Sequence, residues 1–104
     1  MRSLFKARGY TALAVFCKRK HFFSEAGKFY ELASKLFSKY PSRGNTSRLQ
    51  LANSLDCKAM ASLNEKNFSE SFQFFEQAAK IYRELGKPNE ATYVTFFRAP
   101  SGGW

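Results

Sequence analysis

The sequence predicts an all-α protein of two antiparallel helix hairpins followed by a fifth, shorter helix. Two observations lead to this prediction. The chain repeats itself at an offset of 45 residues, with seven identities in the fifteen positions of residues 23–37 and 68–82. In both copies apolar side chains recur every three or four residues, which is the period of an amphipathic helix. With 104 residues, of which 44% are hydrophobic, we expect a single domain over residues 1–104.

The first hairpin is expected over about residues 4–40. Helical spacing extends over about residues 4–20 and 24–40, and the polar segment Lys20-His21-Phe22 joins the two stretches. We expect Ser24 to begin the second helix, because its hydroxyl can accept a hydrogen bond from a free backbone N–H and Glu25 favours the positive helix end. Phe23, just before this cap, is expected to fix how the turn enters the helix.

The second hairpin is expected over about residues 46–85, as helices 46–65 and 69–85 with Ser69 as the equivalent cap and Phe68 before it. Residues 40–46 are rich in Pro, Gly, Ser and Asn and are predicted to form the loop between the hairpins. Gly86 is placed to end the fourth helix. A fifth helix is predicted over about residues 89–98, with a loose tail after it.

The net charge of +9 comes entirely from the first half of the chain. Residues 1–52 contain eleven Lys and Arg against Glu25 and Glu31, whereas residues 53–104 contain six residues of each sign. A half-molecule with this excess attracts anionic partners such as acidic peptides, nucleic acid or anionic lipid headgroups. The alternative interpretation is a solvated basic face that aids solubility.

Both hairpins order their small and large residues in a way that resembles the tetratricopeptide (TPR) repeat. The first contains Tyr10-x-x-Leu13-Ala14-x-x-Cys17, then Ala26-x-x-x-Tyr30 and Ala33; the second contains Leu55-x-x-Lys58-Ala59-x-x-Ser62, then Ser71-x-x-x-Phe75 and Ala78. The resemblance implies a right-handed array of hairpins with small residues where helices cross and Tyr10, Leu13, Ala14 and Cys17 on a buried face. The offset of 45 exceeds the family's period of about 34 residues, and Lys58 stands where the family has Leu. The chain therefore looks most like the extended variant in soluble NSF-attachment proteins, with the three-helix microtubule-interacting-and-trafficking domain as the runner-up.

Helical repeats of this kind commonly bind a peptide or helix in the groove lined by the first helix of each hairpin. The resemblance therefore implies a protein-interaction adaptor whose basic side chains pair with an acidic protein or peptide partner and whose apolar side chains hold an apolar residue. The alternative is that the apolar members pack against the next helix and the charges are solvated. The groove residues implied in this way are Arg8, Thr11, Val15, Lys18, Arg19, Asn53, Asp56, Met60, Leu63 and Asn64.

Two other kinds of partner are consistent with the sequence. The segment 18–23 puts Lys18, Arg19, Lys20 and His21 beside two phenylalanines, a combination that can contact phosphates and stack a base. Nucleic-acid binding is therefore the alternative function. Self-association is the third interpretation, because a homodimer through Phe96 and Phe97 in the predicted fifth helix would bury aromatic surface that one small core does not need.

The sequence carries no motif that predicts catalysis, a cofactor or a metal site. There is no Gly-rich phosphate loop, HExxH or GxSxG pattern, and the single histidine, His21, lacks an orienting acid nearby in the sequence. Cys17 and Cys57 are expected to be separate buried thiols, which favours a reducing compartment such as the cytoplasm. A targeting role for the Arg-rich N-terminus stays open. No apolar run is long enough to span a bilayer.

Overall fold

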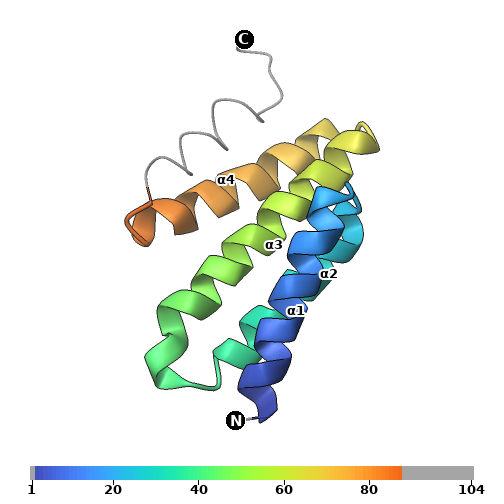
Figure 1. Ribbon diagram of the computed structural model, residues 1–104. Coiled ribbons are helices and arrows are strands. Elements are labelled where there is room, and N and C mark those ends of the chain that lie inside the picture. Colours follow the sequence, from blue (N-terminus) through green and yellow to red (C-terminus); the bar gives the residue numbers. More distant parts are fainter. Residues whose placement is uncertain (1, 88–104) are drawn as a thin grey trace.

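The computed structural model describes residues 2–87, and this part of the chain is built from helices (Figure 1). They are α1 (Arg2–Arg19), α2 (Phe23–Phe37), α3 (Gly44–Asn64) and α4 (Phe68–Glu84), with a 3₁₀-helix, Pro41–Arg43, between α2 and α3. The all-α prediction is confirmed for these residues, and the observed ends of the four helices differ from the predicted ones by three residues or fewer. The predicted fifth helix at 89–98, with Phe96 and Phe97, lies outside the described residues.

Consecutive helices pack against each other in antiparallel pairs, α1 on α2, α2 on α3 and α3 on α4 (Figure 1). The pairs α1–α2 and α3–α4 are the two predicted hairpins. Since α3 contacts both α2 and α4, it lies in the middle of the described part of the chain. The first and second hairpins are thus joined through α2 and α3.

The turns inside the two hairpins have the same geometry. His21 and Lys66, which are 45 residues apart, have φ angles of 65° and 62°. In the first turn the Phe22 N–H donates to the Cys17 carbonyl over 2.8 Å, and in the second the Asn67 N–H donates to the Ser62 carbonyl over 2.9 Å. Both are helix ends closed by a residue in the left-handed region. The repeat seen in the sequence is therefore also a repeat of backbone conformation.

The predicted caps at Ser24 and Ser69 are wrong by two positions. Phe22 and Asn67 precede the first residues of α2 and α4, so both serines lie inside the first turn. Asn67 caps α4, since its side-chain oxygen accepts a hydrogen bond from the Glu70 N–H, whereas Phe22 gives α2 no side-chain cap. Phe23 and Phe68 are accordingly the first helical residues and do not precede the caps. The reason is that the left-handed turn residue starts each helix earlier than the serines indicate.

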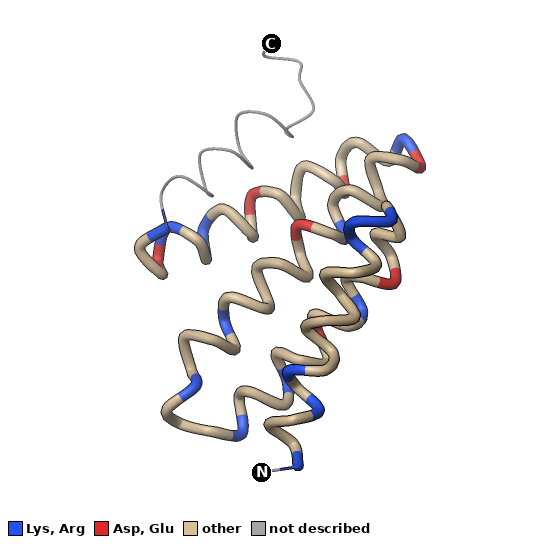
Figure 2. The backbone as a smooth tube through the Cα atoms, in the orientation of Figure 1, with Lys and Arg blue, Asp and Glu red and all other residues tan. Residues whose placement is uncertain are grey.

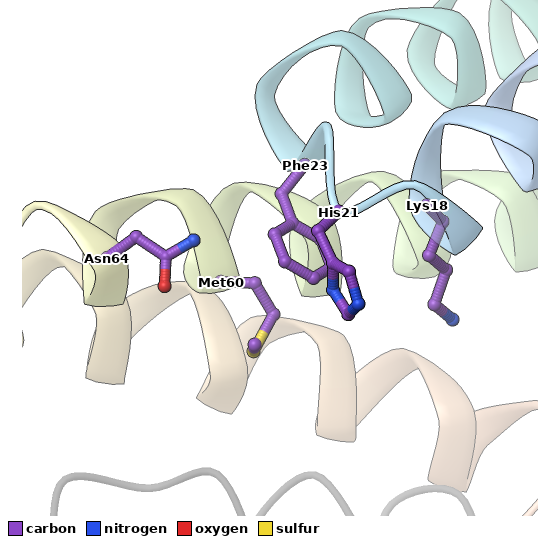
Figure 3. A pocket seen from close by; sticks show the side chains of 5 residues that line it. All are labelled: Lys18, His21, Phe23, Met60 and Asn64. Carbon is purple, nitrogen blue, oxygen red and sulfur yellow. The ribbon is translucent and has the colours of Figure 1, made fainter.

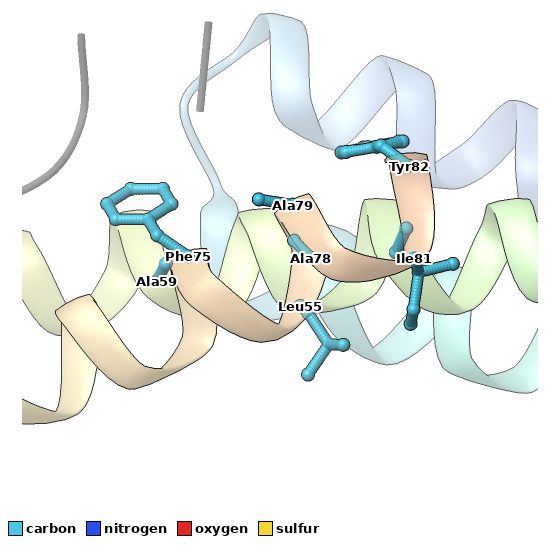
Figure 4. Packing of buried hydrophobic residues seen from close by; sticks show 8 residues of the cluster. Leu55, Ala59, Phe75, Ala78, Ala79, Ile81 and Tyr82 are labelled. Carbon is cyan, nitrogen blue, oxygen red and sulfur yellow. The ribbon is translucent and has the colours of Figure 1, made fainter. Parts of the chain in front are cut away.

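The two hairpins also bury equivalent residues. Four pairs related by the offset of 45 are fully buried, with 0% exposure: Ala7 and Ala52, Ala14 and Ala59, Ala26 and Ser71, and Ala33 and Ala78. Aromatic rings fill the space beside these close crossings. Tyr30 and its equivalent Phe75 are 4% and 1% exposed. Figure 4 shows the second set, where Phe75 and Tyr82 of α4 lie with Leu55 and Ala59 of α3.

The contact between the hairpins is close, and polar side chains take part in it. The Ser54 hydroxyl of α3 donates to the Gly27 carbonyl of α2 over 2.8 Å. Four residues after Ser54 and four residues after Gly27 in the sequence, Lys58 Nζ donates to Glu31 Oε1 over 2.8 Å. Gly27 allows this approach, because an added Cβ would lie 3.2 Å from Lys58 Cγ and 3.4 Å from the Ser54 carbonyl oxygen. Lys58 therefore replaces the Leu of the TPR pattern with a side chain that pairs with α2.

Candidate functional site

A hollow of about 570 Å³ lies between the α1–α2 turn and the C-terminal part of α3 (Figure 3). Three segments contribute to it: Lys18 in the last turn of α1, the turn residue His21 with Phe23 at the start of α2, and Met60 with Asn64 one turn apart on α3. The left-handed conformation of His21 reverses the chain and directs its ring and that of Phe23 to the same side. The turn and the start of α2 therefore supply the two rings of the hollow, and α1 and α3 supply the rest of its lining.

The hollow has an apolar centre with polar ends. The His21 and Phe23 rings meet edge to face with centroids 5.6 Å apart, and Met60 lies next to them in Figure 3. Lys18 and Asn64 stand on opposite sides of this centre. Among the residues that the structure describes, no carboxylate lines the hollow. Chemically, the arrangement suits an apolar side chain flanked by hydrogen-bond acceptors, above all a carboxylate facing Lys18.

Three of the ten residues implied as a groove, Lys18, Met60 and Asn64, come together in this hollow. Arg8 and Arg19 are exposed on α1 away from its lining. The hollow thus collects members of the predicted set from both hairpins, and it lies where the first helices of the two hairpins end.

The other five residues are buried or half-buried. The Thr11 hydroxyl donates to the Ala7 carbonyl over 2.9 Å, and Val15 packs against a buried cluster around Ala14 and Tyr30. Asn53 accepts a hydrogen bond of 2.6 Å from the Tyr82 hydroxyl, which ties α3 to α4. Asp56 is 4% exposed, and Leu63 is half-buried.

His21 and Phe23 are absent from the set implied by the resemblance, although the segment 18–23 was singled out for its cations and aromatics. The repeat does indicate that the two turns are equivalent. It therefore places the residues of the α1–α2 turn at the same end of the fold as those of the α3–α4 turn. The repeat does not indicate which way their side chains point. That follows from the positive φ of His21, a conformation that non-glycine residues rarely adopt.

Two neighbouring side chains of α2, Tyr30 and Glu31, have shifted pKa values because of contacts within the fold. Burial, followed by the charges of Cys57 and Asp56, raises the pKa of Tyr30 to about 12. The hydrogen bond from Lys58 holds the pKa of Glu31 below its usual range. Cys57 is buried, whereas Cys17 is only half-buried, so the expectation of two buried thiols is right for Cys57 alone; no disulfide joins them.

Within residues 2–87 no group of three or more His, Cys, Asp or Glu side chains could hold a metal ion. No helix in this described range has the length and apolar character needed to cross a membrane. Comparisons with protein families, with curated proteins and with solved structures find no match for the chain.

Proposed function

We propose that the chain is a non-enzymatic protein-interaction adaptor of the TPR-like type, and that it holds an acidic peptide or helix at the hollow between its hairpins. The observation that carries the proposal is the hollow itself. It joins Lys18 of α1 with Met60 and Asn64 of α3 around an apolar centre, and its described lining residues include no acid.

The repeated geometry supports the TPR-like assignment. Turn residues, buried small residues and buried aromatics recur at one offset in both hairpins. Helix α4 has a buried cluster of its own with α3, which favours a repeat over the three-helix alternative. The excess of cations in residues 1–52, which only Glu25 and Glu31 oppose, supports an acidic partner. Two cysteines that no disulfide joins fit a reducing compartment such as the cytoplasm.

Selection of short random peptides displayed on phage tests the proposal. We expect the selected peptides to combine Asp or Glu with a large apolar residue. For such a peptide, Lys18→Glu and Met60→Asp should each weaken binding at least about tenfold, the loss typical of a central interface residue. Lys39→Glu is the matched control, because Lys39 is an exposed cation that does not line the hollow.

Two results would refute the proposed function. One is a set of selected peptides without acidic residues, or one whose binding survives both hollow variants. The other is preferential binding of single-stranded nucleic acid that falls steeply between about 50 and 200 mM salt, which is the behaviour of a phosphate-binding surface. Peptide binding anchored by Met60 and Phe23 should fall far less over this range.

A further inference from the structure

The side of α1 that faces away from α2 is apolar and exposed. Phe5, Leu13 and Phe16 are 68%, 47% and 57% exposed, which corrects the expectation that Leu13 belongs to a buried face with Tyr10 and Ala14. Between them lies Gly9, where an added Cβ would meet nothing within 4 Å. We call Phe5, Gly9, Leu13 and Phe16 the outer face of α1. No described helix covers it.

The repeat shows what an equivalent surface does elsewhere in the same protein. At the offset of 45, Phe5, Gly9, Leu13 and Phe16 correspond to Gln50, Ser54, Lys58 and Ala61 of α3. That side of α3 is covered by α2, antiparallel to it. The contact is made by the Ser54 hydrogen bond to Gly27 and the Lys58 ion pair with Glu31, and Gln50 is 7% exposed.

We propose that the outer face of α1 docks an amphipathic helix of another protein, antiparallel to α1, with a small residue over Gly9 and acidic residues along its borders. The small residue follows from α2, where Gly27 sits at the closest approach to Ser54, the equivalent of Gly9. The apolar character follows from α1, which has Leu13 and Phe16 where α3 has Lys58 and Ala61. The occupant of this face therefore needs apolar side chains where α2 has Glu31.

The positive charge of α1 indicates that the partner helix carries acidic residues. Helix α1 contains five Lys and Arg and no carboxylate, and Figure 2 shows it without a single acidic position. Arg2 and Lys6 are exposed beside Phe5, and Lys20 Nζ lies 5.8 Å from the centre of the Phe16 ring. Acidic borders on a partner helix would pair with these cations. Two copies of α1 face to face would instead bring the cations beside one outer face close to those beside the other, with no carboxylate on α1 to offset them, which disfavours a second copy as the occupant.

This surface is separate from the hollow and does not depend on the proposed function. The hollow lies between the α1–α2 turn and the end of α3, whereas the outer face lies on the side of α1 opposite α2. None of the four residues of the outer face lines the hollow. A variant of one surface therefore leaves the other intact.

A synthetic helix tests the proposal. The probe is a fluorescent amphipathic peptide. It has Gly or Ala at the spacing of Gly27, Tyr30 and Ser34, Leu next to these small residues, and Glu along both edges of the apolar face. A second peptide has Lys in place of every Glu. Anisotropy measures binding to the full chain. We expect the acidic peptide to bind, and Leu13→Glu and Gly9→Leu each to weaken it at least about tenfold. Leu32→Glu, at an exposed Leu of α2, and Asn64→Ala, in the hollow, are controls that should not change binding.

Gly9→Leu keeps the test independent of folding, because the new side chain enters open space in a helix and circular dichroism checks that the fold is retained. The proposal is overturned if the acidic peptide does not bind, if the basic peptide binds equally well, or if the Leu13 and Gly9 variants bind like the wild type. It is also overturned if light scattering shows a wild-type dimer that Leu13→Glu converts to monomers, since a second copy would then cover the face.

Discussion

A matched pair of glycine substitutions tests the arrangement of the helices directly. Gly9 of α1 and Gly27 of α2 both lie inside helices, and neither has a positive φ. Their surroundings are opposite. A Cβ on Gly9 would meet nothing within 4 Å, whereas a Cβ on Gly27 would lie 3.2 Å from Lys58 Cγ and 3.4 Å from the Ser54 carbonyl oxygen. Replacing each by Leu therefore separates helix propensity from packing.

Propensity alone makes both variants more stable, since removing Gly from a helix interior stabilises by about 0.5–1 kcal/mol. Gly9→Leu should show this gain in full. In Gly27→Leu the longer side chain pushes α2 from α3, which costs about 1–3 kcal/mol for overpacking and about 1 kcal/mol more for the lost Ser54 hydrogen bond. The net expectation is a loss of about 2 kcal/mol, so the two variants should differ by about 3 kcal/mol.

Urea unfolding followed by circular dichroism at the helix band measures this difference. With a slope of about 1 kcal/mol per molar urea, which is usual for a small protein, the two midpoints should lie roughly 3 M apart. Gly27→Ala adds an intermediate point, because Lys58 can move by the few tenths of an ångström that one methyl requires. Equal stability of Gly9→Leu and Gly27→Leu would refute the close α2–α3 crossing, and with it the equivalence between the outer face of α1 and the α2-facing side of α3.

Three further changes test other parts of the fold. Phe22 and Asn67 have matching backbone angles, but only Asn67 caps its helix. In urea unfolding, Phe22→Asn should therefore stabilise the chain by about 0.5–1 kcal/mol, and Asn67→Ala should destabilise it by a similar amount. Stability changes of the same sign would contradict this. Phe75→Ala should cost about 3–5 kcal/mol, since Phe75 is 1% exposed in the α3–α4 core, and a loss below about 1 kcal/mol would place that ring at the surface. Tyr30, whose pKa is raised from 10.0 to about 12, contributes stability that is complete below pH 10 and is lost as the pH rises to about 12. The wild type should therefore lose about 2–3 kcal/mol more than Tyr30→Phe across this range, and parallel pH profiles would show that Tyr30 is not buried.

The helices were predictable because their apolar spacing and the breaker residues between them are local signals. The 45-residue repeat predicted which helices pair, and the structure has the pairs it predicted. The caps were not predictable from composition alone. Asn67 and Ser69 are both good cap residues, and the left-handed conformation of Lys66 decides between them.

The candidate site was predictable only in part, because side-chain direction depends on neighbouring helices. Lys18, Met60 and Asn64 belong to the set that the TPR resemblance implies, and they meet in the hollow because α1 and α3 end at the same end of the fold. Asn53 was placed in the same set, yet its side chain is bonded to Tyr82 of α4. No local pattern distinguishes an amide that binds a partner from one that ties two helices together.

The distribution of apolar residues on α1 is that of a helix with a neighbouring helix on each of two sides. Helix α3 has two described neighbours and uses both of its sides, with Ala52, Leu55 and Ala59 toward α4 and Ser54 and Lys58 toward α2. Helix α1 is likewise apolar on two sides, although α2 covers only one of them.

A helix that ends an array normally turns a polar side to solvent. The exposed Phe5, Leu13 and Phe16 therefore set α1 apart from a terminal helix and give it the character of an interior one. A ligand that binds only the folded chain raises its stability by mass action, by about 2.7 kcal/mol at a hundredfold excess over Kd. If the outer face is the docking surface, the acidic helix should raise the urea midpoint of the wild type and leave that of Leu13→Glu unchanged, whereas an equal rise in both would place the peptide elsewhere.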